Sequence, residues 1–247
     1  GNDMRYSDDK VKAARNFANK LWNASRYILM NLPEDFGTPV LPENLPIEDK
    51  WVLSLFNDTV KNVTSNLEAF ELGVAVQNLT DFIWDVYCDW YIELTKPRIA
   101  EGGDSALAAQ NVLVYIMQGI LKLLHPFMPF ITEEIFCTLH PKEETIMLAK
   151  WPEYRADWNF PAEEEMLEHC KDLVKGVRNV RTEMDVPPSR KAKIFIVADD
   201  AALRETFEKT REAYQNLAGA SDVSVQAGKN GIEDDAVSVV IPGATLY

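Results

Sequence analysis

Residues 105–139 read SALAAQNVLVYIMQGILKLLHPFMPFITEEIFCTL, and this stretch decides the fold class of the chain. Apolar side chains recur at helical spacing as far as Leu124, which predicts a long amphipathic helix. His125 and Pro126 break this helix, since proline lacks the backbone N–H that a helix interior uses, and Pro129 starts a shorter one. The stretch therefore predicts two helices joined by a tight turn.

Three further helices are predicted on the amino-terminal side of this stretch, over residues 7–31, about 47–67 and about 70–94. Ser7 is a favourable N-cap for the first of them. A proline-rich loop is expected over residues 32–47. Pro97 is expected to end the third helix, and Gly102-Gly103 is expected to form the turn that follows it. Long amphipathic helices joined by short loops are typical of an antiparallel bundle, which we expect over residues 1–152.

The carboxyl-terminal part of the sequence has a different pattern. After a polar and aromatic linker, expected over residues 153–162, a helix is predicted over residues 163–185. There follow a β-branched run at 194–197, a helix that is capped by Asp199 or Asp200 and extends to Leu217, and strand-like runs at 223–225 and 236–241. We therefore predict a mainly α chain, in which a helical bundle is followed by a small α/β subdomain over residues 163–247.

The composition is that of a globular chain with a sizeable core, since 47% of the 247 residues are apolar and 26% are charged. No stretch approaches the roughly 20 consecutive apolar residues that a membrane helix needs, so we expect no membrane association. Three scattered cysteines and three histidines argue against a disulfide framework and a zinc site. The polar first residues predict no signal peptide, and we expect a cytoplasmic protein.

Sequence motifs for catalysis are absent. The chain has no P-loop, no G-x-S-x-G and no H-E-x-x-H. Glu133 and Glu134 lie near His140, but consecutive residues of a helix point about 100° apart and do not converge. We therefore expect no active site, no metal and no cofactor in this chain.

The charge is unevenly distributed. The formal net charge is −14, which by itself argues against nucleic-acid binding. Residues 1–31, however, hold six basic and three acidic side chains, and residues 171–193 hold seven basic and three acidic side chains. The pattern indicates two local basic surfaces on an acidic body, or two ordinary solvated helix faces.

One side of the first predicted helix is polar and has no carboxylate after Asp9. On a helical wheel, this side is opposite an apolar side that includes Val11, Ala14, Leu21 and Ile28. Basic side chains for phosphates, amides for base edges and aromatic rings for stacking are what recognition of an RNA loop requires. The candidate nucleic-acid-binding residues are Arg15, Asn19, Lys20, Trp22, Asn23, Arg26 and Tyr27. A merely solvated face is the alternative.

A second basic surface is predicted on the helix at 163–185 and just after it. Its candidate residues are Lys171, Lys175, Arg178, Arg181, Arg190 and Lys191. The alternative is that acids at the start of this helix and bases near its end simply suit the helix dipole.

Four segments of the sequence resemble the anticodon-binding region of valyl-tRNA synthetases, which are class I aminoacyl-tRNA synthetases. They are RNFANKLWNA at 15–24, LHPFMPFITEEI at 124–135, Trp151-Pro152 and RNVRTEMDVPP at 178–188. The HPFMPF segment is shared with isoleucyl and leucyl relatives, whereas the first and last segments resemble valyl members. The likeness extends over nearly the whole chain.

This resemblance implies a parent enzyme that joins valine to tRNA(Val) with ATP and Mg²⁺. The HIGH and KMSKS signatures of such enzymes do not occur here, so catalytic and editing domains are expected upstream in a longer chain. A carboxyl-terminal coiled coil is expected downstream. The resemblance implies that this chain recognises the anticodon stem-loop without chemistry of its own, and we expect a monomer.

Two alternatives stay open at this stage. The first is the same domain from an isoleucyl enzyme. The second is a helical protein-interaction module without an RNA role, in which acidic residues around Glu163–Glu165 and Asp234–Asp235 bind a basic partner.

Overall fold

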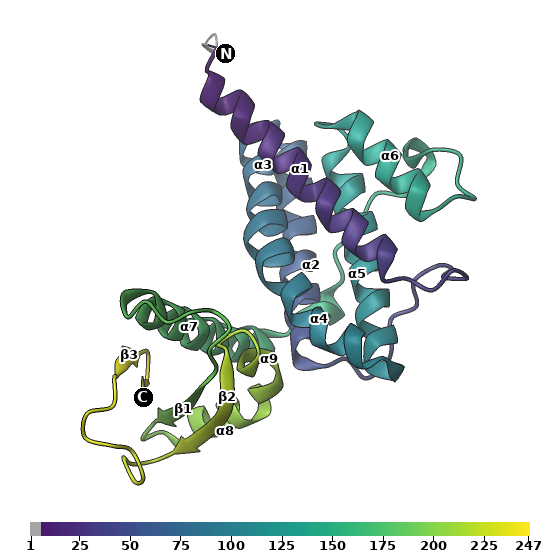
Figure 1. The fold of residues 1–247 in the computed structure, drawn as a ribbon. Helices are drawn as coiled ribbons and strands as arrows, with labels where there is room; N and C mark the ends of the chain where they lie inside the picture. The colour runs from purple at the N-terminus through teal and green to yellow at the C-terminus, as the bar shows by residue number, and fades with distance from the viewer. Residues whose placement is uncertain (1–5) are drawn as a thin grey trace. The chain divides into compact units, whose positions relative to one another are not determined.

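The computed structural model describes residues 6–247, and the chain divides into two compact units between Asn159 and Phe160. The first unit is helical, and the second combines helices with a small sheet (Figure 1). This arrangement confirms the predicted fold class, a mainly α chain with a helical bundle followed by a small α/β element.

The first unit is a bundle of long helices. Its elements are α1 (Asp8–Met30), α2 (Ile47–Glu68), α3 (Leu72–Asp81), the π-helix η1 (Phe82–Tyr91), α4 (Ile92–Glu101), α5 (Gly103–Leu124) and α6 (Pro129–Leu139), followed by the short 3-10 helices η2 (Ile146–Leu148) and η3 (Ala156–Trp158). Ser7 occupies the N-cap position of α1 with extended backbone, although its side chain makes no capping hydrogen bond.

Helix α5 forms the centre of the bundle. Val112, Ile116 and Ile120 are fully buried, and α5 packs on α2, α4 and α6. This helix is long and apolar enough to cross a membrane, but 67% of its most apolar window is buried inside the protein. Packing at the bundle centre therefore accounts for its apolar character.

The third predicted helix does not end at Pro97. It continues as α3, η1 and α4, and Pro97 lies inside α4. Packing overrides the local effect of proline here, because Leu94 and Thr95 are buried and Arg98 in the next turn is tied to Asp49 of α2. The predicted turn at Gly102 and Gly103 is present, and both residues have positive φ.

A glycine in α5 permits the close approach of α2. A Cβ atom at Gly119 would lie 2.3 Å from Cζ of the buried Phe56 ring. We expect Gly119→Ala to lower the free energy of unfolding by about 1–3 kcal/mol, because the ring has no room to withdraw. Gly73→Ala, where a Cβ meets nothing within 4 Å, is the matched control and should be neutral or stabilising. Urea unfolding followed by tryptophan fluorescence measures both, and equal effects would contradict the packing described.

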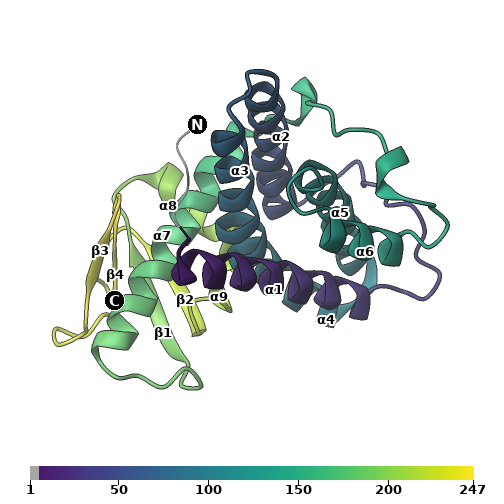
Figure 2. The ribbon, with the colours of Figure 1, turned by 90° about the horizontal axis from the view of Figure 1, so that it is seen from above.

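The second unit has one helical layer on one face of a four-stranded sheet of order β2-β1-β4-β3 (Figure 2). Its elements are α7 (Pro161–Glu183), β1 (Ala192–Val197), α8 (Ala201–Lys209), α9 (Arg211–Gln215), β2 (Ala220–Gln226), β3 (Val239–Ile241) and β4 (Ala244–Leu246). Strand β1 is parallel to β2 and antiparallel to β4. Ile194, Ile196 and Leu246 are buried beneath the helices.

Two expectations for this unit are corrected. The helix predicted from Asp199 or Asp200 to Leu217 is divided into α8 and α9 at Thr210. The Thr210 side chain is buried, and its hydroxyl group donates a hydrogen bond to the Thr206 carbonyl. Asp200 is the cap of α8 and accepts a hydrogen bond from the Ala202 N–H. Strand β4 was not predicted, because it lies beyond the last strand-like run at 236–241, after a tight turn at Pro242 and Gly243.

Candidate nucleic-acid interface

Helix α1 lies on one side of the bundle (Figures 1 and 2) and packs against η1, α5 and α6. Leu21, Ala24 and Ile28 are buried along the side that faces these elements. The opposite side of α1 consequently faces away from the bundle over its second half.

Five of the predicted RNA-binding residues are exposed on that outer side, and we call them the open face of α1: Arg15, Asn19, Trp22, Asn23 and Arg26. Among the described residues, none of these five side chains makes a hydrogen bond or an ion pair. From Arg15 to Arg26 the face extends over about 16 Å of helix. Two guanidinium groups, two amides and an indole ring are therefore available to an external partner.

Lys20 does not belong to the open face. Its Nζ atom lies 2.5 Å from Asp89 Oδ1 and 3.7 Å from the centroid of the Trp84 ring, both on η1. The neighbouring Phe17 ring stacks on Trp84 at 6.4 Å between centroids. The expected phosphate contact is therefore replaced by an intramolecular one, which holds α1 on the bundle.

Tyr27 lies at the border between the open face and α4. Its side chain is half-buried, and burial raises the pKa of its hydroxyl group. The ammonium group of Lys96 lies 5.8 Å from the ring centroid of Tyr27 and 2.6 Å from Glu93 Oε1. Lys96 is thus a basic residue beside the interface that the helical wheel missed, because it comes from another helix.

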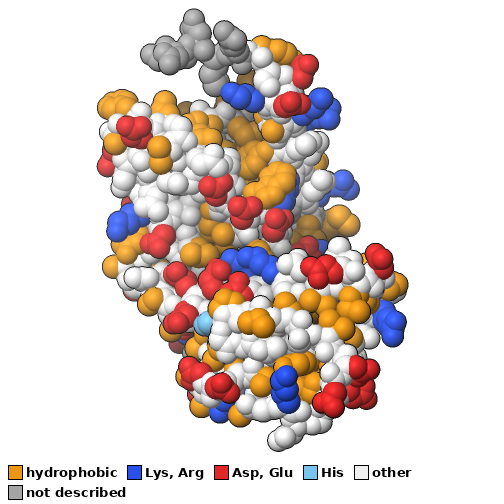
Figure 3. Space-filling model, turned by 90° about the vertical axis from the view of Figure 1, so that its left-hand side faces the viewer, with side chains coloured by type: hydrophobic (Ala, Val, Ile, Leu, Met, Phe, Trp, Pro, Cys, Tyr) orange, Lys and Arg blue, Asp and Glu red, His pale blue; other side chains and the backbone are white. Residues whose placement is uncertain are grey.

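The first turns of α1 are less covered than the wheel predicted. Val11 and Ala14 were assigned to the core side but are exposed. Ala14 and Phe17 border a shallow groove of about 580 Å³ that is also lined by Trp84 and Phe127. Figure 3 shows apolar side chains gathered in a hollow beside the start of α1. A wheel cannot predict this exposure, because the neighbouring helices do not extend beside the first turns.

The second predicted basic surface is only partly available. Arg178 donates to the Leu217 carbonyl, and Arg181 donates to the carbonyls of Pro187 and Arg190. Lys171 lies 2.6 Å from Glu168. The side chains of Lys175, Arg190 and Lys191 are exposed and make no polar contact with the part of the chain that the structure describes.

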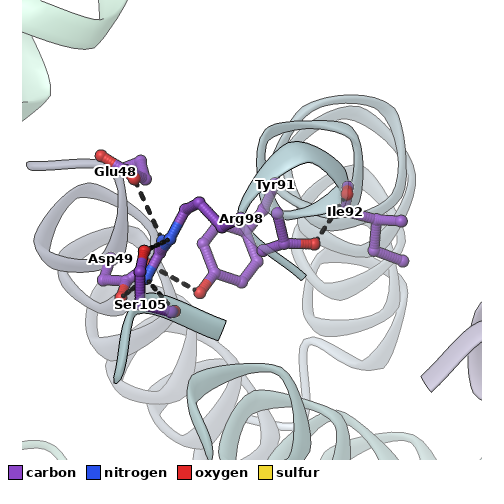
Figure 4. Close-up of polar contacts among 7 residues, drawn as sticks. Glu48, Asp49, Tyr91, Ile92, Arg98 and Ser105 are labelled. Atoms are coloured by element: carbon purple, nitrogen blue, oxygen red, sulfur yellow. Dashed lines mark hydrogen bonds and ion pairs between the residues drawn. The ribbon is translucent and has the colours of Figure 1, made fainter. Parts of the chain in front are cut away.

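A buried ion pair fixes α4, the helix beside Tyr27, to α2 (Figure 4). The Arg98 guanidinium donates to both oxygens of Asp49 at 2.6 and 2.9 Å, and to Glu48 at 3.0 Å. Tyr91 donates its hydroxyl to Asp49 at 2.8 Å, and Ser105 accepts from the Arg98 Nε at 3.0 Å. The Asp49 side chain is fully buried, so its charge depends on these donors.

Cys88 lies on η1, one residue before the Asp89 that anchors Lys20. Burial raises the pKa of its thiol to about 12. In a C137S/C170S variant, we expect iodoacetamide at pH 8 to modify Cys88 at least 100-fold more slowly in the folded chain than in urea, since the thiolate is the reactive form. Because the folded chain binds this proton more tightly, the free energy of unfolding should also fall as the pH rises from 9 towards 12. Similar alkylation rates in both states would contradict a buried Cys88.

No group of three or more His, Cys, Asp or Glu side chains within residues 6–247 is arranged to hold a metal ion. The chemistry that the arrangement offers is recognition of an extended anionic surface by the open face of α1.

Comparison with known proteins identifies the family of the chain. Residues 49–196 match the family described as the anticodon-binding domain of tRNA ligase. The chain belongs to this family of tRNA-binding domains. The match begins in α2, so the role of α1 depends on its own geometry.

Relatives that align along the whole chain are ligases specific for one amino acid. Similar proteins include the valine–tRNA ligases of Clostridium tetani, Clostridium acetobutylicum and Carboxydothermus hydrogenoformans, at 45%, 43% and 40% identity. Each alignment covers all of this chain and 28% of the relative. The chain therefore corresponds to the anticodon-binding part of much longer enzymes.

Proposed function

We propose that this chain is the anticodon stem-loop recognition module of a valine–tRNA ligase. The observation that carries the proposal is the open face of α1, which is exposed and free of carboxylates of its own. Arg15 and Arg26 would contact phosphates and position the stem, while Asn19 and Asn23 would meet the edges of unpaired bases. Trp22, of which 41% is exposed, offers a ring for stacking.

The catalytic steps would take place outside this chain. In the longer enzyme, catalytic and editing domains would supply activation of valine with ATP and Mg²⁺, and transfer to tRNA(Val). Binding at the open face of α1 would orient the acceptor end of the tRNA toward those domains. We propose that the longer enzyme is a soluble cytoplasmic monomer. Of the predicted second basic surface, Lys175, Arg190 and Lys191 would add phosphate contacts.

The discriminating experiment is a binding titration of the chain with tRNA(Val) and tRNA(Ile) transcripts at several salt concentrations. Salt-sensitive binding with preference for the valine transcript is expected. Equal affinity for both transcripts would favour a contact that does not distinguish tRNA(Val) from tRNA(Ile), or the isoleucyl alternative. Absence of binding at low salt would favour the alternative of a protein-interaction module, in which the exposed Asp234 and Asp235 meet a basic partner.

A further inference from the structure

Among the described residues of the second unit, no helix covers one face of its sheet. Residues of β1 alternate, so that Ile194 and Ile196 lie under the helices while Lys193, Phe195 and Val197 point to the other side. Phe195 and Tyr247 form a directly paired couple, since each N–H donates to the other's carbonyl at 2.9 Å. Their side chains therefore lie on the same, uncovered side. We call this surface the open sheet face.

Two aromatic rings and two ammonium groups meet on the open sheet face. The Lys193 ammonium lies 4.7 Å from the Phe195 ring centroid, and the Lys229 ammonium lies 4.9 Å from the Tyr247 ring centroid. Phe195 and Tyr247 are half-buried, while Lys193 and Lys229 are exposed. Each ring is thus adjacent to a positive charge on the surface.

The face also carries one carboxylate, since Asp222 of β2 lies opposite Lys193 and its Oδ2 atom lies 3.6 Å from the Lys193 ammonium. Both side chains of this ion pair are exposed, so an external phosphate can reach Lys193 only in competition with Asp222.

Thr245 lies opposite Val197 on β4, and Ser224 lies opposite Phe195 on β2. One hydroxyl group therefore lies beside Phe195 on the neighbouring strand, and another lies two residues before Tyr247 on β4. The exposed residues Arg190 and Lys191 immediately precede β1, and they add positive charge beside the start of this strand.

We infer that the open sheet face binds single-stranded RNA, with Phe195 and Tyr247 stacking on two unpaired bases and Lys193 and Lys229 meeting the phosphates. Aromatic residues on neighbouring strands of a four-stranded sheet, flanked by basic groups, offer each base a π surface and its backbone a countercharge. The inference depends on the proposed function in taking the ligand to be RNA. It assigns a second RNA contact on a different unit from the open face of α1.

The test uses the whole chain and three probes: octauridylate, an anticodon stem-loop RNA and inorganic polyphosphate. Phe195→Leu with Tyr247→Leu removes both rings and keeps apolar side chains. We expect octauridylate affinity to fall roughly 5- to 100-fold, the range for loss of a stacked base, with polyphosphate binding unchanged. Phe130→Leu, at a 90% exposed aromatic residue on α6, is the matched control and should change nothing.

Substitution of the two lysines is a second test of the inference, and it leaves the aromatic residues of the sheet unchanged. Lys193→Ala with Lys229→Ala should reduce the slope of log affinity for octauridylate against log salt by about 1.4, or 0.7 per single-strand phosphate contact. Unaltered octauridylate binding in a folded Phe195/Tyr247 variant, or an unaltered slope in the lysine variant, would overturn the inference. Stem-loop binding reports on the open face of α1, so failure of the two proposals can be told apart.

Discussion

Replacing Arg15, Asn19 and Arg26 together by alanine should weaken binding of a tRNA(Val) transcript by roughly 10- to 100-fold. The slope of log affinity against log salt should fall by about 2, one for each arginine that contacts a phosphate. Both effects follow from the exposure of these side chains and from their lack of partners within the described chain. Fluorescence anisotropy at several salt concentrations measures affinity and slope together.

The matched control removes the same two charges from another part of the first unit. Lys142→Ala with Lys150→Ala changes exposed lysines that lie after α6. If binding depended only on net charge, this control would weaken it as much as the triple variant does. We expect the control to leave affinity within about twofold, and an equal loss in both variants would remove the open face of α1 from the interface.

Loss of the buried carboxylate beneath α4 should have the largest effect on stability. Asp49→Asn leaves the Arg98 guanidinium without its main countercharge in a buried site, and we expect the free energy of unfolding to fall by about 3–5 kcal/mol. All six tryptophans lie in the first unit, so urea unfolding followed by tryptophan fluorescence reports on the bundle alone.

Two further variants separate burial from charge pairing. Glu93→Gln breaks the exposed pair with Lys96 and should cost no more than about 1 kcal/mol. Adding Arg98→Met to Asp49→Asn removes the unpaired charge and should recover part of the lost stability. An Asp49→Asn variant as stable as the parent chain would show that the ion pair does not hold α2 and α4 together.

The sequence predicts the helices well where apolar spacing and breakers agree. The Gly102–Gly103 turn and the His125–Pro126 break both occur as expected, because each residue limits the backbone directly. The prediction fails at Pro97, where contacts between helices decide the outcome. The π-helical geometry of η1, which packs on α1 and α2, was likewise not predicted from the sequence.

Prediction of the candidate site from the sequence is limited in the same way, because contacts between distant residues are not visible in it. A wheel sorts residues by angle, so it correctly predicts exposure for Arg15, Asn19 and Arg26. It cannot show that Asp89, sixty-nine positions away, pairs with Lys20. Nor can it show that Arg181 is occupied by carbonyl groups of the loop before β1. Such contacts join distant parts of the chain, and only the folded structure reveals them.

Photo-crosslinking from the open face of α1 tests the central claim most directly. A photoreactive phenylalanine analogue at Asn23, and a matched one at the exposed Val40 outside α1, would be irradiated in complex with a tRNA(Val) transcript. We predict crosslinks from position 23 that map to the anticodon loop, with few or none from position 40. Crosslinks from position 23 confined to other parts of the tRNA, or absent while position 40 reacts, would contradict recognition of the anticodon by α1.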